Sequence, residues 1–412
     1  MRGDSVGHKY VIRTRPFILS IFLILLIFED VISHLIRPIQ LYDELLAIIL
    51  TLYYIAHVIR RGKIRRKDGL IVLIVIVLLT IGFRGNFNSK IQNNSILCIF
   101  DAFNIFKFIG AILGAQLIFD HYRFKELLIE YTSFMVKLAV AISTICMILN
   151  FFANIGMHTD YRYSMRAYNF LYSRVGDFYN ACVLWIIILT ASLYYRNSKN
   201  TKLFIVLALI NMCATLRSRA WGYALLFVIL YYALIIRRER KFRWWYAAAF
   251  ATMVSFISAD QFSYYFSGDR ARKVLLKYGI ITARNYFPLG SGFATYGTAI
   301  AQRHYSELYR IYNFSLYWGL SPDRRSFLTD NFWPAVMAEM GFIGAVLMAI
   351  LLCIVASEFL RVTDNKYSKV CVYFGLGTLF LSSLIASSFF SCTPLMIIMC
   401  VIVRTVPNAR FS

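Results

Sequence analysis

The sequence has 412 residues, of which 59% are hydrophobic, and its mean hydropathy is +0.61. This composition excludes a soluble protein with a single membrane anchor, because apolar runs of membrane-spanning length recur from Phe17 to the C-terminus. The formal net charge of +23 would indicate nucleic-acid binding in a soluble protein. Cytoplasmic loops of membrane proteins collect Lys and Arg, however, so topology explains much of the charge and no nucleic-acid partner is expected.

Twelve apolar segments follow in chain order, and each is close to the length that a bilayer requires. The first comes after Lys9, Arg13 and Arg15 and resembles a signal peptide. No small-residue cleavage site follows it, so we interpret it as a retained helix. The predicted limits of the segments are 17–36, 39–59, 69–83, 96–119, 132–152, 178–195, 203–216, 220–236, 244–262, 331–356, 370–389 and 390–404.

The charges between these segments predict the topology. With a cytoplasmic N-terminus, the inner loops are strongly basic and the short outer loops contain few Lys or Arg, as the positive-inside rule requires. The basic inner stretches are 60–67, 196–202, 237–243 and 361–369. The sequence therefore predicts an all-α polytopic protein of the cytoplasmic membrane with both termini inside.

One outer loop, residues 263–330, is much longer than the others. It holds nine Lys or Arg and four Asp or Glu, together with many Tyr and Phe residues. An anionic ligand or anionic lipid headgroups would explain the charge, and sugar rings or an interfacial aromatic belt would explain the aromatic residues. We expect this loop to lie on the membrane and to divide the chain into residues 1–262 with nine spans, the loop, and residues 331–412 with three spans.

Two stretches place arginines at the predicted outer membrane edge. LRSRAWGYALL carries Arg217 and Arg219 in a tight hairpin between two spans, where a charge is costly unless it is functional or reaches lipid headgroups. SRVGDFYNACV carries Arg174 and Asp177 near one helical turn apart, so these two side chains can also pair with each other. Arginine keeps its charge and grips phosphate oxygens in a forked geometry, which favours a phosphate ligand.

Two further stretches lie in or after the long loop. FPLGSGFATYG has glycines for tight turns but no P-loop pattern, and we expect it to turn the chain back towards the membrane. DNFWPAVMAEMGFIG begins the tenth span with Asp330 and Asn331, either of which is a good helix N-cap. Glu339 lies inside the apolar run, and a buried carboxylate needs a partner, for which we expect an arginine of the outer face.

These four stretches, in this order along residues 173–350, resemble the O-antigen polymerase and O-antigen ligase superfamily. Its members are bacterial polytopic membrane glycosyltransferases that act on polyprenyl-diphosphate-linked sugars. The resemblance implies a GT-C-like fold, an active site on the large extracytoplasmic loop, arginines that hold the donor pyrophosphate, and a catalytic residue at the end of the loop. Many members of the ligase branch have a histidine where this chain has Asp330, so the polymerase branch is favoured.

The resemblance also implies a mechanism. A hydroxyl of one lipid-linked glycan attacks the anomeric carbon of another with inversion, Asp330 accepts the proton, and Arg219 stabilises the departing diphosphate. His304, the only histidine of the long loop, is a rival base. The residues expected to bind substrate are Arg217, Arg272, Arg174, Arg284, Tyr305, Glu339 and His304.

Cofactors, metals and disulfides are not expected. The sequence has no D-x-D motif to hold a metal at a diphosphate, its six histidines are scattered, and its eight cysteines form no CxxC pair. The expected partners are polyprenyl-diphosphate-linked oligosaccharide as donor and acceptor, membrane lipid, and the flippase and chain-length regulator proteins of such a pathway. A ligase is the alternative within the family, and a lipid-linked sugar flippase or a non-enzymatic scaffold is the alternative outside it.

Overall fold

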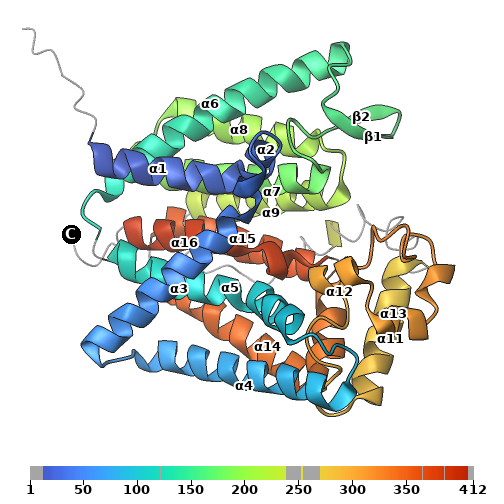
Figure 1. Ribbon diagram of the computed structural model, residues 1–412. Helices are drawn as coiled ribbons and strands as arrows, with labels where there is room; N and C mark the ends of the chain where they lie inside the picture. The colour runs from blue at the N-terminus through green and yellow to red at the C-terminus, as the bar shows by residue number, and fades with distance from the viewer. Residues whose placement is uncertain are drawn as a thin grey trace, which may run out of the picture.

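A computed structural model describes residues 13–120, 122–237, 252–253, 270–363, 365–384 and 386–406. In these residues the protein is a bundle of long helices with one small β-hairpin (Figure 1). Seven helices of the described part are long and apolar enough to cross a membrane. They cover Arg37–Arg61, Arg66–Ser89, Ser95–Asp120, Lys125–Phe152, Val175–Tyr195, Ser218–Ile236 and Phe332–Val362. The protein is thus an all-α polytopic membrane protein, as the sequence predicts, and the count of twelve spans stays a prediction.

The bounds of the elements are as follows. The helices are α1 (Thr14–Ile27), α2 (Glu29–Ser33), α3 (Tyr42–Arg61), α4 (Arg66–Ser89), α5 (Ser95–Asp120), α6 (Lys125–Phe152), α7 (Val175–Tyr195), α8 (Lys199–Cys213), α9 (Ser218–Tyr231), α11 (Ala271–Asn285), α12 (Ala299–His304), α13 (Glu307–Ile311), α14 (Phe332–Val362), α15 (Lys366–Ser383) and α16 (Thr393–Thr405). Short 3-10 or π turns are η1 (Arg37–Leu41), η2 (Tyr232–Ile236), η3 (Phe314–Leu316) and η4 (Ser388–Ser391). The strands are β1 (His158–Arg162) and β2 (Met165–Tyr168).

Most predicted spans coincide with helices, with two differences. The segment 244–262 falls almost wholly outside the described residues. The segment 17–36 is not one helix, because Phe28 leaves the helical conformation and separates α1 from α2. Glu29 and Asp30 follow at the first turn of α2, where the helix dipole favours acidic side chains. This break turns α2 aside from the direction of α1.

Burial separates central helices from lipid-facing ones. α7 is buried around nearly its whole circumference, with Trp185 and Ile186 fully inside the bundle. α3 instead exposes Ile48, Leu52 and Ile55, which recur every three or four residues and so form one apolar stripe. A stripe of this kind fits contact with lipid chains and not with water.

The bundle has two distinct ends in Figure 1. The end at which α14 begins, on the right, carries α11, α12, α13 and the β-hairpin, and we call it the loop end. The end at which α1 begins and α16 ends, on the left, is called the terminal end. The hairpin joins α6 to α7 and pairs His158 with Tyr168. These two strands are not among the elements that the sequence predicts.

Residues 270–331, called the loop unit, have a hydrophobic core of their own. Tyr296, Tyr309 and Phe314 are completely buried in it, and the rings of Tyr309 and Phe314 stack at a centroid distance of 5.1 Å. The loop is thus folded around its own core, and its expected position on the membrane stays a prediction. Its aromatic residues mainly pack against one another, whereas Trp318 is 68% exposed.

Residues 287–297, called the glycine loop, enter the bundle between α4, α5 and α14. Phe293 is fully buried and its ring packs against that of Phe83 on α4 at 5.1 Å. Asn86 of α4 binds the backbone of Phe293 in both directions, at 2.8 Å each. The contacts with α4 agree with the predicted turn towards the membrane, and the depth of the loop in a membrane stays a prediction. Irregular backbone is tolerated there because protein surrounds it.

The glycine loop breaks α14. Gly341 has φ +67° and ψ −178°, which interrupts the helix, and a Cβ atom at this position would collide with the carbonyl oxygen of Pro288. The backbone N–H groups of Ser291 and Gly292 donate to the carbonyls of Ala338 and Glu339 at 2.8 and 2.9 Å. The loop therefore supplies hydrogen bonds that the broken helix lacks.

We expect Gly341→Ala to lower the thermal stability of the protein in detergent. The left-handed backbone costs about 1–2 kcal/mol for a residue with a Cβ, and overpacking against Pro288 adds about 1–3 kcal/mol. Gly69→Ala is the matched control, because Gly69 is helical and its nearest neighbour lies at 3.6 Å. Equal melting temperatures of the two variants would contradict this view of the break.

Candidate functional site

Glu339 binds the glycine loop and not an arginine. Its side chain is completely buried on α14, and Oε1 accepts hydrogen bonds from the backbone N–H groups of Thr295 and Tyr296, both at 3.0 Å. The hydroxyl of Thr298 is a third donor at 3.4 Å. The prediction of an arginine partner is wrong, because the break in α14 brings backbone amides to the carboxylate instead. Glu339 thus fastens the glycine loop to α14, and its expected part in substrate binding stays a prediction.

A second carboxyl group lies beside Glu339. Asp101 of α5 is 1% exposed, and its Oδ2 accepts from the backbone N–H of Ala294 at 2.7 Å. The Asp101 and Glu339 carboxyl groups contact each other, and each has one buried oxygen without a donor among the described residues. The glycine loop is thus bound by one carboxyl group of α14 and one of α5.

The sequence held a signal for Asp101 that the sequence analysis did not use. Asp101, Asn104 and Lys107 recur every three residues within the apolar segment of α5, so they form one polar stripe. Ionisable residues inside a membrane span mark functional positions by default.

Three arginines from separate parts of the chain act on Asp330. Its Oδ2 lies 3.2 Å from Nη2 of Arg272 on α11. Arg219 at the start of α9 and Arg174 before α7 also act electrostatically on this carboxylate. Burial raises the pKa of Asp330 above its usual value, and the three arginines, Arg272 foremost, oppose that rise. We call Asp330 with Arg174, Arg219 and Arg272 the Asp330 group.

The start of α14 holds the Asp330 group together. Asn331 occupies the N-cap position of α14, as the sequence predicts, but its side chain does not cap the helix. Its Nδ2 donates instead to the backbone carbonyl of Arg272 at 3.0 Å. Asp330 thus binds the side chain of Arg272, and Asn331 binds its backbone. Together these two contacts fix α11 to α14.

A polar cavity of about 550 Å³ adjoins the Asp330 group. Arg174 and Thr329, the residue before Asp330, line it, together with Asn180 of α7 and Arg303 of α12. Within the described residues no ion pair joins Arg174 to Asp177, so Asp177 does not neutralise this arginine by direct contact. A cavity of this size is in the usual range for small-molecule ligands.

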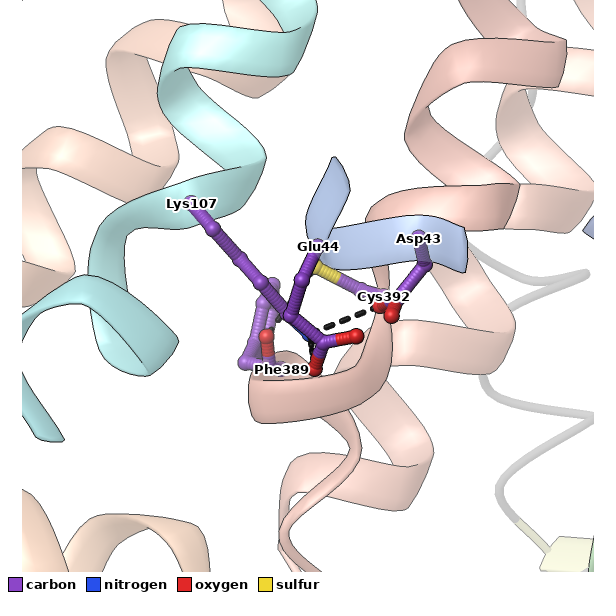
Figure 2. Close-up of polar contacts among 5 residues, drawn as sticks. All are labelled: Asp43, Glu44, Lys107, Phe389 and Cys392. Atoms are coloured by element: carbon purple, nitrogen blue, oxygen red, sulfur yellow. Dashed lines mark hydrogen bonds and ion pairs between the residues drawn. The ribbon is translucent and has the colours of Figure 1, made fainter. Parts of the chain in front are cut away.

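The same cavity reaches a buried ion cluster (Figure 2). Nζ of Lys107 lies 2.7 Å from Oδ2 of Asp43 and 2.6 Å from Oε1 of Glu44, and the lysine side chain is 5% exposed. Cys392 adjoins these side chains, and its Sγ donates to the carbonyl of Phe389 at 3.1 Å. We call Lys107, Asp43 and Glu44 the Lys107 cluster.

The Lys107 cluster bears on metal binding. Among the described residues, Glu29, Asp43 and Glu44 are the one group of three acidic, His or Cys side chains close enough to share a metal ion, with ligand atoms within 4.8 Å of one another. The ammonium group of Lys107 already binds two of these three carboxylates. Lys107 thus supplies there the positive charge that a bound cation would otherwise supply.

Arg217 lies at the loop end but binds the β-hairpin. Its Nη2 is 3.0 Å from Oδ2 and 3.2 Å from Oδ1 of Asp160 on β1. The ring of Tyr163, at the turn of the hairpin, stacks on that of Trp221 at a centroid distance of 6.0 Å. These contacts give Arg217 a structural role, in which it joins the hairpin to the start of α9.

Three further predicted residues are not brought to Asp330. Arg284 is exposed near the end of α11, twelve residues after Arg272, which is about 18 Å along a helix. Tyr305 is buried in the loop unit and its hydroxyl donates to the carbonyl of Leu320 at 3.1 Å, which argues against contact with a substrate. His304 is exposed at the end of α12, next to the cavity-lining Arg303.

Variants of Glu339 test the carboxylate as the fastener of the glycine loop. We expect Glu339→Gln to melt near the wild-type temperature, because the amide oxygen accepts from Thr295 and Tyr296 while the new N–H donates towards Asp101. Glu339→Ala leaves two buried N–H groups without acceptors, at about 1–3 kcal/mol each, and melts earlier. If an arginine were the partner, loss of charge alone would make the glutamine variant as unstable as the alanine variant.

No protein-family model matches the sequence, and no curated protein matches it. The geometry of the Asp330 group and its polar cavity is therefore the basis on which a function is argued.

Proposed function

We propose that this protein is a bacterial polysaccharide polymerase, which joins polyprenyl-diphosphate-linked oligosaccharide repeats at the outer face of the cytoplasmic membrane. One observation carries the proposal: the carboxylate of Asp330 pairs with Arg272 at 3.2 Å, the charges of Arg219 and Arg174 also act on it, and Arg174 and the neighbouring Thr329 line a polar cavity. Arginine charges suit a diphosphate leaving group, and a partly desolvated carboxylate suits proton abstraction.

The roles follow from the charges. Asp330 takes the proton of an acceptor hydroxyl, whose oxygen forms a bond to the anomeric carbon of the donor. The bond from that carbon to the phosphate oxygen breaks, and the lipid diphosphate leaves with the electron pair. Arg174 and Arg219 stabilise the growing negative charge, each by roughly 4 kcal/mol at 4 Å and an effective dielectric of 20. Two arginines thus replace a divalent metal, and attack opposite the leaving group inverts the anomeric centre.

The topology in this proposal puts the loop end outside the cell and both termini inside, with twelve spans in a GT-C-like arrangement. The charges of the terminal end support it. Arg65 and Arg404 both bind Asp120, at 2.8 and 2.6 Å, and Lys67 pairs with Glu358. Basic side chains at this end agree with the positive-inside rule. Flippase and chain-length regulator proteins are the partners expected at the membrane.

Two other functions remain as alternatives. An O-antigen ligase would use the same Asp330 group with a different acceptor. A lipid-linked sugar flippase is favoured by the Lys107 cluster, because buried ion pairs in a polar cavity are typical of transport pathways. We prefer the polymerase because the Asp330 group lies at one end of the bundle, which suits a fixed one-sided site better than alternating access.

The decisive experiment is polymerisation by the purified protein alone. Purified protein with a lipid-linked oligosaccharide in EDTA is expected to make a ladder of longer lipid-linked products. Asp330→Asn is expected to fold normally and to make no ladder, because the amide cannot accept the proton. Asp323→Asn, a change of an exposed carboxylate of the same loop unit, is the matched control and keeps the ladder.

Each negative outcome has its own meaning. No ladder with or without magnesium contradicts the polymerase, and transport of the lipid-linked sugar in vesicles would then favour the flippase. A ladder that needs magnesium contradicts catalysis by arginines alone. A normal ladder from Asp330→Asn contradicts the assignment of the base, and His304→Ala is then the next variant to assay.

The pH–rate profile tests Asp330 independently. A general base acts when deprotonated, so activity falls as pH drops through its pKa. Since burial raises the pKa of Asp330, the acid limb should lie above the ordinary aspartate value of about 3.9. Arg272 lowers that pKa, so Arg272→Ala should move the limb to still higher pH. Lys273→Ala, which removes an exposed neighbouring charge, is the control and should leave the limb in place.

A further inference from the structure

We propose that Asp30 of α2 is a positioning residue, which fixes Arg174 for the diphosphate of the substrate. The inference rests on the proposed function, in which Arg174 binds that diphosphate. Asp30 lies 144 residues before Arg174 in the sequence, and nothing in the sequence pattern joins them. The contacts of Ser173, the residue immediately before Arg174, make the connection.

Asp30 binds Ser173 with both of its carboxylate oxygens. Oδ2 accepts from the backbone N–H of Ser173 at 2.7 Å, and Oδ1 accepts from its hydroxyl at 2.8 Å. Nε2 of His34 lies 2.9 Å from the same hydroxyl. Asp30 also lines the polar cavity, but both of its carboxylate oxygens bind Ser173, so its effect on Arg174 passes through Ser173.

A second set of contacts holds Tyr172, the residue before Ser173. The hydroxyl of Tyr172 donates to the carbonyl of Ile27 at 2.9 Å, and its buried ring lies 6.2 Å from that of Phe28. Ile27 and Asp30 lie on either side of the break between α1 and α2. They bind Tyr172 and Ser173, the two residues that precede Arg174. The break in the first helix has a consequence here, because it turns Asp30 towards the start of α7.

Arg174 is then fixed from both directions. On its C-terminal side, its carbonyl accepts from the N–H groups of Asp177 and Phe178 at 3.1 and 3.3 Å, in the first turn of α7. On its N-terminal side, Asp30 holds Ser173. Arg174 lines the polar cavity and its charge acts on Asp330. A displacement of about 1 Å at such a group can cost about 100-fold in rate.

The first test compares two substitutions of Asp30. Asp30→Ala removes both bonds to Ser173, and we expect kcat/KM for the lipid-linked donor to fall about 10–100-fold. Asp30→Asn keeps the shape: its carbonyl accepts from the Ser173 N–H, and its amide donates to the Ser173 hydroxyl. For the asparagine variant, kcat/KM should fall less than about 3-fold, because the position of Ser173 matters and the charge of residue 30 does not. Glu307→Ala, which breaks an exposed ion pair of 3.6 Å with Arg310, is the control and should leave kcat/KM unchanged.

A double-mutant cycle separates positioning from general stability. If Asp30 acts through Arg174, the double variant Asp30→Ala/Arg174→Ala has the same kcat/KM as Arg174→Ala alone. If Asp30 only stabilises the fold, the two effects multiply and the proposal is wrong. Where Asp30→Ala does not yield folded protein, Ser173→Ala, which removes one of the two bonds, takes its place in the cycle.

Binding of a polyprenyl diphosphate without sugar gives a readout that does not need polymerase activity. In detergent, Asp30→Ala should weaken its binding, Asp30→Asn should not, and the cycle with Arg174→Ala should again be non-additive. If the wild type makes no ladder but shows this pattern, the polymerase is wrong and the positioning role stands. If the wild type makes ladders but Asp30→Ala binds the diphosphate normally, the positioning role is wrong and the polymerase stands.

Discussion

The structure depends on one exchange of hydrogen bonds, between a broken helix and an inserted loop. A helix in a membrane must satisfy its own backbone, and α14 fails to do so where Gly341 interrupts it. The carbonyls of Ala338 and Glu339 and the side chain of Glu339 take their donors from the glycine loop instead. This exchange locks the loop unit onto the bundle. Because Asp330 begins the same helix, its place among the arginines depends on that lock.

Hydropathy predicts most of this fold because long apolar segments in a membrane have few options other than helix. It fails where a contact between particular residues decides the path. The first predicted span reads as continuous, yet it breaks at Phe28, and Asp30 just after the break binds Ser173, 143 residues further along the chain. The hairpin around Tyr163 escapes prediction because its strands are only five and four residues long, too short for a clear periodic signal. The core of the loop unit escapes it because residues well apart in the loop, such as Tyr278 and Phe314, pack together without a period.

The candidate site was predictable in part. Motif order predicts that Arg219 and Asp330 belong to one site; the charge of that arginine acts on the carboxylate, and the shared role stays a prediction. Residue type alone did not tell which other side chains would join them. Arg217 and Tyr305 were equally plausible by type, but each is held by a structural partner. The partner of Glu339 was unpredictable in principle, because a backbone amide has no signature in the sequence.

The Lys107 cluster has a consequence for the chemistry beside it. Lys107, Asp43 and Glu44 put charged groups on the wall of the same cavity that Arg174 lines. We expect water to enter a cavity with such polar groups. In a polymerase of the kind proposed, a water molecule there competes with the sugar hydroxyl for the same anomeric carbon. Such an enzyme avoids wasteful hydrolysis only by keeping the leaving group inactive until the acceptor has displaced that water.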